Sequence, residues 1–250
     1  MSMAAVAALC AICFTLRSDT VSSRQSPSTR LLALPSETLW VWQRTEDLRN
    51  LDQKKMAIAC LDQTIVIGAG VEGRPRFQPL AYPTGTTLVS VVRIEVRPGA
   101  QLDAEAQQKT VQLLLESAGR PGIAAFQVDF DATREQRSFY TDVLQQLRRR
   151  MSASLPLSMT ALASWCSYDD WISNLPVDEV VPMFFRMEPD RRRARPDLSV
   201  FRIREPLCMH SVGISTREPW PQEMAGKRIY VFPDRGWRED FSLIQDRKLQ

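Results

Sequence analysis

The chain has 250 residues, 44% of them hydrophobic, so it can bury the core of one large domain or two small ones and is not expected to be disordered. Its 32 Lys and Arg residues exceed its 29 Asp and Glu residues by only three charges, which is too few to predict a nucleic-acid surface. Its five cysteines are too few and too scattered to form a disulfide framework: Cys10, Cys13, Cys60, Cys166 and Cys208.

The N-terminal segment MSMAAVAALCAICFTL, residues 1–16, has the length of a signal-peptide apolar region but lacks the preceding Lys or Arg. It is too short to span a bilayer comfortably, and a Ser-, Thr- and Arg-rich stretch follows it. We expect residues 1–30 to be an atypical export signal or membrane anchor with its linker, and residues 31–250 to be the folded domain. On this interpretation the protein is exported or anchored at the cell envelope, and only this segment contacts the membrane. The alternative is a misassigned start codon.

Short apolar runs alternate with helical patterns after residue 31, as in a parallel sheet joined by crossover helices. The first three strands are predicted at residues 38–43, 56–67 and 87–96. Residues 68–87 are rich in Gly and Pro, so we expect a long loop there rather than a helix.

A helix is predicted at residues 102–119, because Val111, Leu114 and Leu115 recur on one face. Asp103 is its expected N-cap and Gly119 its expected C-cap.

The fourth strand lies in GIAAFQVDFDAT, residues 122–133. The segment from Thr133 to Gln136 has the spacing of a capping box for the helix that follows. A fifth strand at residues 157–165 completes a βαβ unit, and a short helix is expected at residues 167–175.

The last three strands are predicted at residues 178–185, 209–217 and 227–232. Eight strands with mostly helical crossovers and no antiparallel hairpin signal favour a TIM-like (β/α)8 barrel. The chain is near the lower end of the length range for this fold, so some helices must be short or replaced by loops, at 68–87 and 189–206.

Side chains on the fourth strand alternate between its two faces. Phe126, Val128 and Phe130 share one face, while Gln127, Asp129 and Asp131 share the other. A polar inner face is costly on a buried strand unless it lines a site. We therefore expect the polar face to point into the barrel and the apolar face to pack against the helices.

Polar and aromatic side chains follow most of the predicted strands. The C-terminal strand ends form the active face of a TIM barrel, so these side chains would lie together on one rim. Sugar rings stack on aromatic faces, and glycosidic cleavage uses a carboxyl acid with a second carboxylate, so the rim predicts a carbohydrate site. The candidate substrate-binding residues are Gln43, Arg93, Trp165, Trp220 and Trp237.

No metal site or cofactor is expected. His210 is the only histidine and has no neighbouring cluster of ligand residues in the sequence. The segment GAGVEG follows a strand, but a proline-rich loop comes next where a dinucleotide fold would begin its phosphate-binding helix.

Five strand segments resemble the successive strand motifs of a bacterial domain family of unknown function that belongs with the TIM-barrel glycoside hydrolases: LWVWQR, VVRIEV, FQVDFDA, LSMTALASW and VDEVVPMFF. The resemblance covers roughly residues 36–247. The chain is also distantly similar to the barrels of glycoside hydrolase family eighteen, whose fourth strand ends in a D-x-D-x-E pattern with Glu as the acid. This similarity implies that Asp129 and Asp131 match the two aspartates, and it puts Thr133 where the glutamate is expected.

The first functional hypothesis is a glycoside hydrolase-like enzyme acting on an envelope or extracellular polysaccharide. Asp131 would be the general acid, Asp129 would orient it or stabilise the transition state, and Glu95 would be the second carboxylate. Two carboxylates this close on one strand should raise one pKa, as a general acid requires.

The alternative is a non-catalytic saccharide-binding barrel, which Thr133 at the glutamate position favours. A surface-anchored scaffold without a ligand is a third possibility. Asp129 also has a structural interpretation, as an ion-pair partner of Arg93, and Trp165 and Trp237 have one as packing residues.

Overall fold

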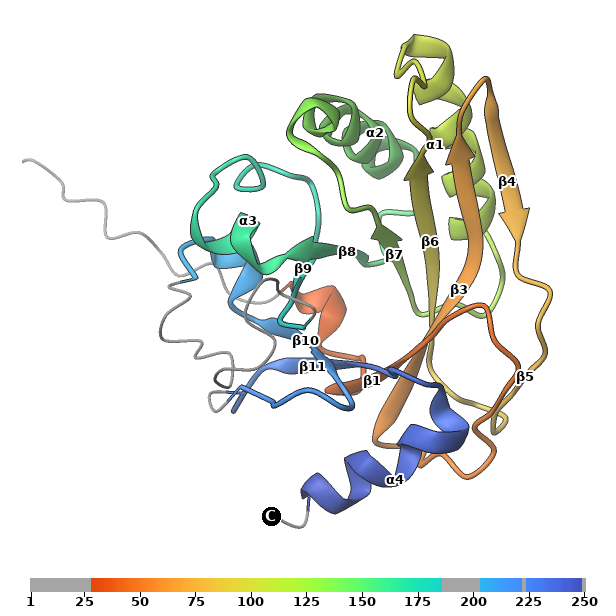
Figure 1. Cartoon of the computed structure of the whole chain (residues 1–250), viewed down its shortest axis with the longest axis vertical. Helices are drawn as coiled ribbons and strands as arrows, with labels where there is room; N and C mark the ends of the chain where they lie inside the picture. The colour runs from red at the N-terminus through yellow and green to blue at the C-terminus, as the bar shows by residue number, and fades with distance from the viewer. Residues whose placement is uncertain (1–27, 186–202, 222–223, 249–250) are drawn as a thin grey trace, which may run out of the picture.

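The computed structural model describes residues 28–185, 203–221 and 224–248. Eight parallel strands form a closed barrel, because β1 pairs with β11 on one side and with β3 on the other (Figure 1). The barrel strands are β1 (Glu37–Val41), β3 (Met56–Ile67), β6 (Leu88–Val96), β7 (Ala125–Asp129), β8 (Leu157–Leu162), β9 (Glu179–Met183), β10 (Ser211–Ser215) and β11 (Arg228–Phe232). The predicted TIM-like barrel is confirmed.

The described residues contain only four α-helices for these eight strands, so the barrel is a reduced one. The helices are α1 (Ala104–Ala118), α2 (Arg137–Arg150), α3 (Ala163–Ser167) and α4 (Trp237–Lys248), with 3-10 turns η1 (Thr29–Leu31), η2 (Arg134–Gln136) and η3 (Pro206–Cys208). Figure 1 shows α1 and α2 beside each other on the outer side of β6 and β7, and α4 at the opposite end of the molecule. The predicted loop at 189–206 falls largely outside the described residues.

The two predicted helix starts are confirmed by their caps. The Asp103 carboxylate accepts a hydrogen bond from the Ala106 backbone N–H at 2.9 Å, and Gly119 is the C-cap of α1. The capping box of Thr133 and Gln136 is formed as well, and it starts η2, which leads directly into α2.

The segment between β3 and β6 has no helix, as predicted, but it contains two strands that the sequence interpretation missed. β4 (Val71–Pro75) turns back antiparallel to β3, and β5 (Leu80–Ala81) pairs with β2 (Glu46–Asp47) in a separate small sheet. The expectation of no antiparallel hairpin is therefore wrong. The turn at Gly68–Gly70 is short enough for the outer half of β3 to pair with the returning chain.

The end of the fifth strand also differs from its prediction. The last residue of β8, Leu162, pairs with the last residue of β9, Met183, and no strand partner continues beyond them. The chain therefore turns into α3 at Ala163, where the sequence predicted three more strand residues. The helix expected at 167–175 is replaced by turns.

The alternation predicted for β7 is confirmed. Phe126, Val128 and Phe130 belong to the buried apolar layer that the barrel shares with α1 and α2. Gln127 points inward, where it accepts a hydrogen bond from Trp40 Nε1 at 2.8 Å and donates one to Ser158 Oγ at 3.0 Å. The Gln127 amide thus has a partner for both its oxygen and its nitrogen, as a buried polar group needs.

A buried ion pair between Glu179 and Arg228 lies where β9 and β11 begin, at the N-terminal end of the barrel strands. Glu179 is 1% exposed and accepts hydrogen bonds from Arg228 Nε at 2.9 Å and from the Tyr230 hydroxyl at 2.7 Å. Ser158 and Ser211 also donate to this carboxylate. Burial and the charge of Glu179 raise the pKa of Tyr230, so its hydroxyl remains a donor. All carboxylate partners are inside the protein, which makes this cluster structural.

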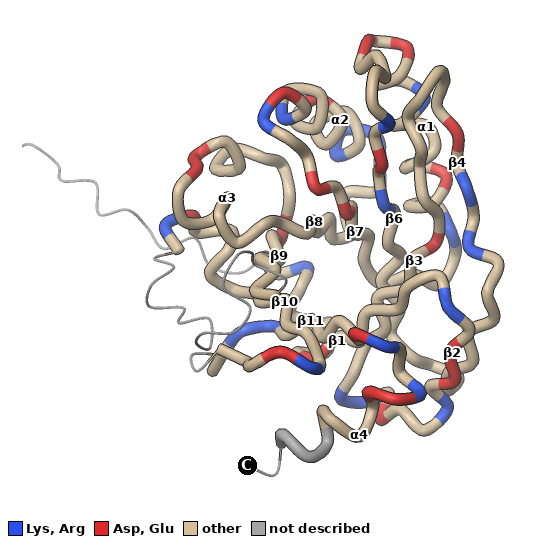
Figure 2. The backbone as a smooth tube through the Cα atoms, in the orientation of Figure 1, with Lys and Arg blue, Asp and Glu red and all other residues tan. Residues whose placement is uncertain are grey.

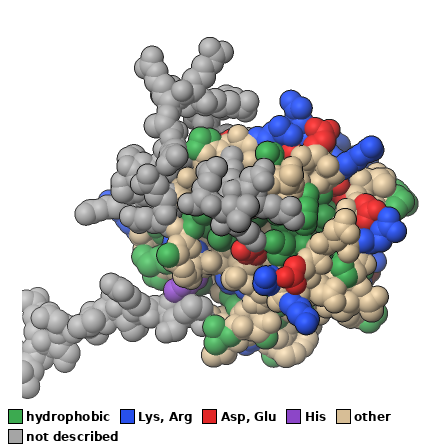
Figure 3. Space-filling view, turned by 90° about the horizontal axis from the view of Figure 1, so that it is seen from below, with side chains coloured by type: hydrophobic (Ala, Val, Ile, Leu, Met, Phe, Trp, Pro, Cys, Tyr) green, Lys and Arg blue, Asp and Glu red, His purple; other side chains and the backbone are tan. Residues whose placement is uncertain are grey.

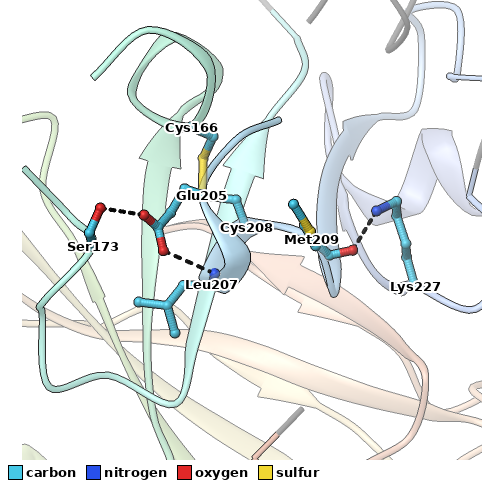
Figure 4. Close-up of a disulfide and its surroundings, with 7 residues drawn as sticks. All are labelled: Cys166, Ser173, Glu205, Leu207, Cys208, Met209 and Lys227. Atoms are coloured by element: carbon cyan, nitrogen blue, oxygen red, sulfur yellow. Dashed lines mark hydrogen bonds between the residues drawn. A yellow bond between two sulfur atoms is a disulfide. The ribbon is translucent and has the colours of Figure 1, made fainter. Parts of the chain in front are cut away.

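A disulfide joins Cys166 of α3 to Cys208 of η3, across 42 residues of sequence (Figure 4). The sequence predicted no disulfide framework and did not single out this pair, which the barrel brings together from distant segments. The Glu205 carboxylate supports the same junction by accepting hydrogen bonds from Ser173 Oγ at 2.6 Å and from the Leu207 N–H at 3.2 Å. The disulfide fixes the segment before β10 to the segment after β8.

On the face in Figure 3, basic and acidic side chains are interspersed with hydrophobic and polar ones. Among the helices that the structure describes, none is long and apolar enough to cross a membrane. The predicted export signal or anchor lies outside the described residues, apart from Ser28 to Arg30.

Candidate functional site

Asp129 is the last residue of β7 and points into the barrel, with only 2% of its surface exposed. Thr160 Oγ1 on β8 donates a hydrogen bond to its Oδ1 at 2.6 Å. Arg93 Nη1 on β6 lies 2.5 Å from its Oδ2, because the strand register sets Arg93 directly beside Asp129. The ion pair considered from the sequence is therefore present, and both carboxylate oxygens have a partner.

Asp131 lies two residues further along, where the chain leaves β7 at the mouth of the barrel. Its side chain is 44% exposed, and Arg93 Nη2 is 3.3 Å from its Oδ2. Partial burial raises the pKa of the Asp131 carboxyl, and the charge of Asp129 raises it further, although Arg93 acts in the opposite direction. Asp131 therefore keeps its proton to a higher pH than an ordinary aspartate does.

Arg93 connects the three carboxylates that the sequence placed in the site. Besides its contacts with Asp129 and Asp131, its Nε lies 3.5 Å from Glu95 Oε1 on the same strand. Figure 2 shows basic and acidic residues close together towards the ends of β6 and β7. The three predicted catalytic residues thus lie around one guanidinium.

A hollow of about 420 Å³ opens beside this cluster, lined by residues of β3 and β6 and by the segments that follow β1 and β11. Gln43, Arg93 and Glu95 are predicted site residues that line it. Gln43 Nε2 donates to Thr64 Oγ1 at 3.2 Å, which fixes the amide on one wall. Asp129 and Asp131 adjoin the hollow through their contacts with Arg93.

Trp42 also lines the hollow, and the sequence interpretation missed it. The ring is half-buried, stands 4.2 Å from Trp40 between ring centroids, and has the Arg93 guanidinium 5.9 Å above it. Strand alternation was the available signal, since Trp40 and Trp42 are two residues apart in the predicted strand at 38–43 and so share one face. Trp42 is therefore a partly exposed aromatic side chain at the mouth of the barrel.

Two of the three tryptophans that the sequence placed on the rim, Trp165 and Trp237, are buried in the core. Trp165 is 2% exposed and packs edge-on against Trp171, and Trp237 is 1% exposed with its Nε1 donating to the Trp40 carbonyl at 2.9 Å. A buried ring cannot stack on a sugar. Trp165 and Trp237 therefore do not lie on the rim as expected, and the alternative interpretation of both as packing residues is favoured. Trp220 is half-buried, and its Nε1 donates to the Ser215 carbonyl at 2.8 Å at the end of β10.

The carboxyl groups of Asp129 and Asp131 lie in different environments. Asp129 is enclosed by a cation and a hydroxyl donor, whereas Asp131 has a longer contact with the same cation and a raised pKa. Such a pair can supply one group that donates a proton and one that stabilises positive charge. Among the described residues, no group of three or more His, Cys, Asp or Glu side chains is arranged to hold a metal ion.

Solved structures with a similar fold include two bacterial spore proteins. The chitinase domain of the spore coat protein CotE from Clostridium difficile aligns over 69% of this chain and 58% of its own, with 14% identity and a TM-score of 0.45. The Bacillus cereus spore cortex-lytic enzyme SleL aligns over 72% of this chain and 51% of its own, with 14% identity and a TM-score of 0.49. The chain therefore spans little more than half the length of these structures.

No curated protein sequence matches the chain. A family model does match residues 84–185, the part that carries β6 to β9 and with them Arg93, Glu95, Asp129 and Asp131. That family is described as a domain of unknown function, DUF3142, and the resemblance expected from the strand motifs is confirmed over these residues.

Proposed function

We propose that the mouth of the barrel binds and hydrolyses a saccharide of the cell envelope or of an extracellular polysaccharide. The observation that carries this proposal is the position of Asp131, a rim carboxyl with a raised pKa beside the buried Asp129. A general acid needs both solvent access and a proton at working pH.

In this mechanism Asp131 donates its proton to the glycosidic oxygen. Its contact with Arg93 is 3.3 Å, against 2.5 Å for Asp129, so Arg93 holds Asp129 more closely and leaves Asp131 freer to carry a proton. Asp129 stabilises the oxocarbenium-like transition state, and Glu95 is the second carboxylate that acts on the sugar or on water.

Substrate contacts come from the walls of the hollow. Gln43 and Arg93 offer hydrogen-bond donors, and Trp42 offers a partly open ring on which a sugar can stack. Trp220 at the end of β10 is a further candidate contact. We therefore extend the substrate-binding set by Trp42 and leave out the buried Trp165 and Trp237.

A second candidate is a saccharide-binding barrel without catalysis. Arg93 contacts all three carboxylates, and a cation favours their ionised form, which has no proton to donate. Thr133 at the position where glycoside hydrolase family eighteen has its acid also favours this candidate. On this reading the hollow and Trp42 bind sugar, and no bond is broken.

The substitution Asp131→Asn separates the two. It keeps the shape but removes the proton, so an enzyme should lose about 10² to 10⁴-fold of its turnover while it still binds saccharide. Asp142→Asn makes the same chemical change on the exposed face of α2 and should leave turnover unchanged. Release of reducing ends from a panel of envelope and extracellular polysaccharides is the assay. Equal turnover in wild type and Asp131→Asn would rule out Asp131 as the acid.

We also propose that the chain is exported or anchored at the cell envelope. The disulfide between Cys166 and Cys208 supports this, since disulfides persist in oxidising compartments and are rare in the cytosol. Fractionation of cells expressing the full chain should find it in the periplasm or with the membrane. A full-length cytosolic product with both thiols reduced would contradict the proposal.

A further inference from the structure

β4 leaves one strand edge open on an otherwise closed barrel. It pairs with β3 alone among the described strands, so only one of its two edges is used. The antiparallel register sets Ile65 opposite Gly73, and the backbone bonds Gly68 N–H to Gly70 O and Arg76 N–H to Asp62 O, both 2.8 Å, belong to the same register. Bonded pairs alternate along an antiparallel ladder, so the backbone groups of Val71, Gly73 and Pro75 point to the open edge.

The side chains along this edge carry opposite charges on either side of Gly73. Glu72 and Arg74 form an exposed ion pair at 2.9 Å, with 64% and 51% of their side chains accessible. They lie on the same face of the sheet, two residues apart. A two-fold axis through Gly73 would therefore set Glu72 of one copy directly opposite Arg74 of another.

We propose that two copies of this chain associate by antiparallel pairing of β4 with β4 about a two-fold axis at Gly73. The N–H and C=O groups of the two Gly73 residues pair reciprocally, and each Val71 N–H donates to the Pro75 carbonyl of the second copy. Pro75 lacks a backbone N–H, so in this register one hydrogen bond is missing at each end of the paired segment. The two cross-strand Glu–Arg pairs give the interface its register.

Charged residues and proline on an edge also serve to prevent association. Like charges on an edge repel their own two-fold image, whereas Glu72 and Arg74 are complementary to theirs. The same register places Phe77 opposite Ala69 of the second copy, beside the turn between β3 and β4. Phe77 is 81% exposed in the single chain, so association would cover this large apolar side chain.

The test is a charge swap in the full chain, measured by sedimentation equilibrium. Wild type should dimerise, while Arg74→Glu and Glu72→Arg each set like charges opposite each other and should weaken association about tenfold or more. The double variant Glu72→Arg/Arg74→Glu restores complementarity and should dimerise like wild type. The matched control is the exposed pair Asp47 and Arg49 at β2, 2.5 Å apart, whose swap should not change the association.

Circular dichroism checks that each variant is folded. A second measurement uses Glu72→Cys/Arg74→Cys, which should form a disulfide between copies under mild oxidation, because the two positions meet across the axis. The corresponding single-cysteine variants should not cross-link at these sites, as peptide mapping would show. A wild-type monomer at all concentrations, or single charge variants that dimerise as well as wild type, would overturn the proposal.

Discussion

Replacing Arg93 by Met removes the cation on which the mouth of the barrel depends. Asp129 is 2% exposed and keeps only its 2.6 Å hydrogen bond from Thr160 in the variant. Breaking a buried ion pair by removing one partner costs about 3 to 5 kcal/mol, because it leaves an uncompensated buried charge. Arg93 itself is 26% exposed and the Thr160 bond remains, so we expect a loss at the lower end, about 3 kcal/mol.

Urea denaturation of wild type and Arg93→Met near neutral pH measures this loss. Arg97→Met is the matched control, because Arg97 is 57% exposed and its nearest carboxylate oxygen, on Glu95, is 3.9 Å away. The control should cost less than about 1 kcal/mol, as exposed pairs do. Adding Asp129→Asn to Arg93→Met removes the buried charge and should recover part of the stability. If Arg93→Met costs no more than Arg97→Met, the argument that Arg93 compensates a buried carboxylate is refuted.

Three further outcomes follow from the structure. Removing the disulfide by Cys166→Ser/Cys208→Ser should cost about 4 kcal/mol by the chain-entropy estimate for a 42-residue separation, and an unchanged thermal midpoint would show that the bond contributes nothing. Because the pKa of Asp131 is raised in the folded protein, its ionisation destabilises the fold above that pKa and has no effect in acid, where both states are protonated. The thermal midpoint of Asp131→Asn minus that of wild type should therefore rise between about pH 3 and about pH 7. A fall in this difference over the same range would contradict a raised pKa for Asp131. Trp42→Ala should weaken saccharide binding, measured by calorimetry, while Trp165→Phe should leave it unchanged, and equal affinities in wild type and Trp42→Ala would exclude Trp42 from the site.

The barrel could be predicted because its strands carry strong local signals. The 12 residues of β3 were predicted with both bounds right, and Asp103 and the capping box at Thr133 marked helix starts that the structure confirms. The hairpin of β3 and β4 could not be predicted from its short polar second strand, since β4 is held by its register with β3 rather than by an apolar pattern. Likewise, the pairing of Cys166 with Cys208 depends on the closure of the barrel and leaves no sign in the spacing.

The acidic part of the candidate site was predictable, whereas its aromatic part was not. Alternation along one strand predicted that Asp129 and Asp131 point inward. The adjacency of the third and fourth predicted strands predicted that Arg93 pairs with Asp129. The tryptophans were chosen by their nearness to strand ends, and this rule ignores which way a ring points. Trp165 lies in the short helix α3 and is buried in the core, while Trp42, the residue after β1, lines the hollow.

The central claim is that a saccharide binds at the mouth of the barrel within reach of Asp131. A crystal structure of Asp131→Asn, grown with a polysaccharide fragment that the wild type retains or cleaves, tests it most directly. We predict a sugar ring against Trp42, with hydrogen bonds to Gln43 or Arg93 and a glycosidic oxygen next to residue 131. A fragment bound elsewhere on the protein, with the hollow empty, would contradict the claim.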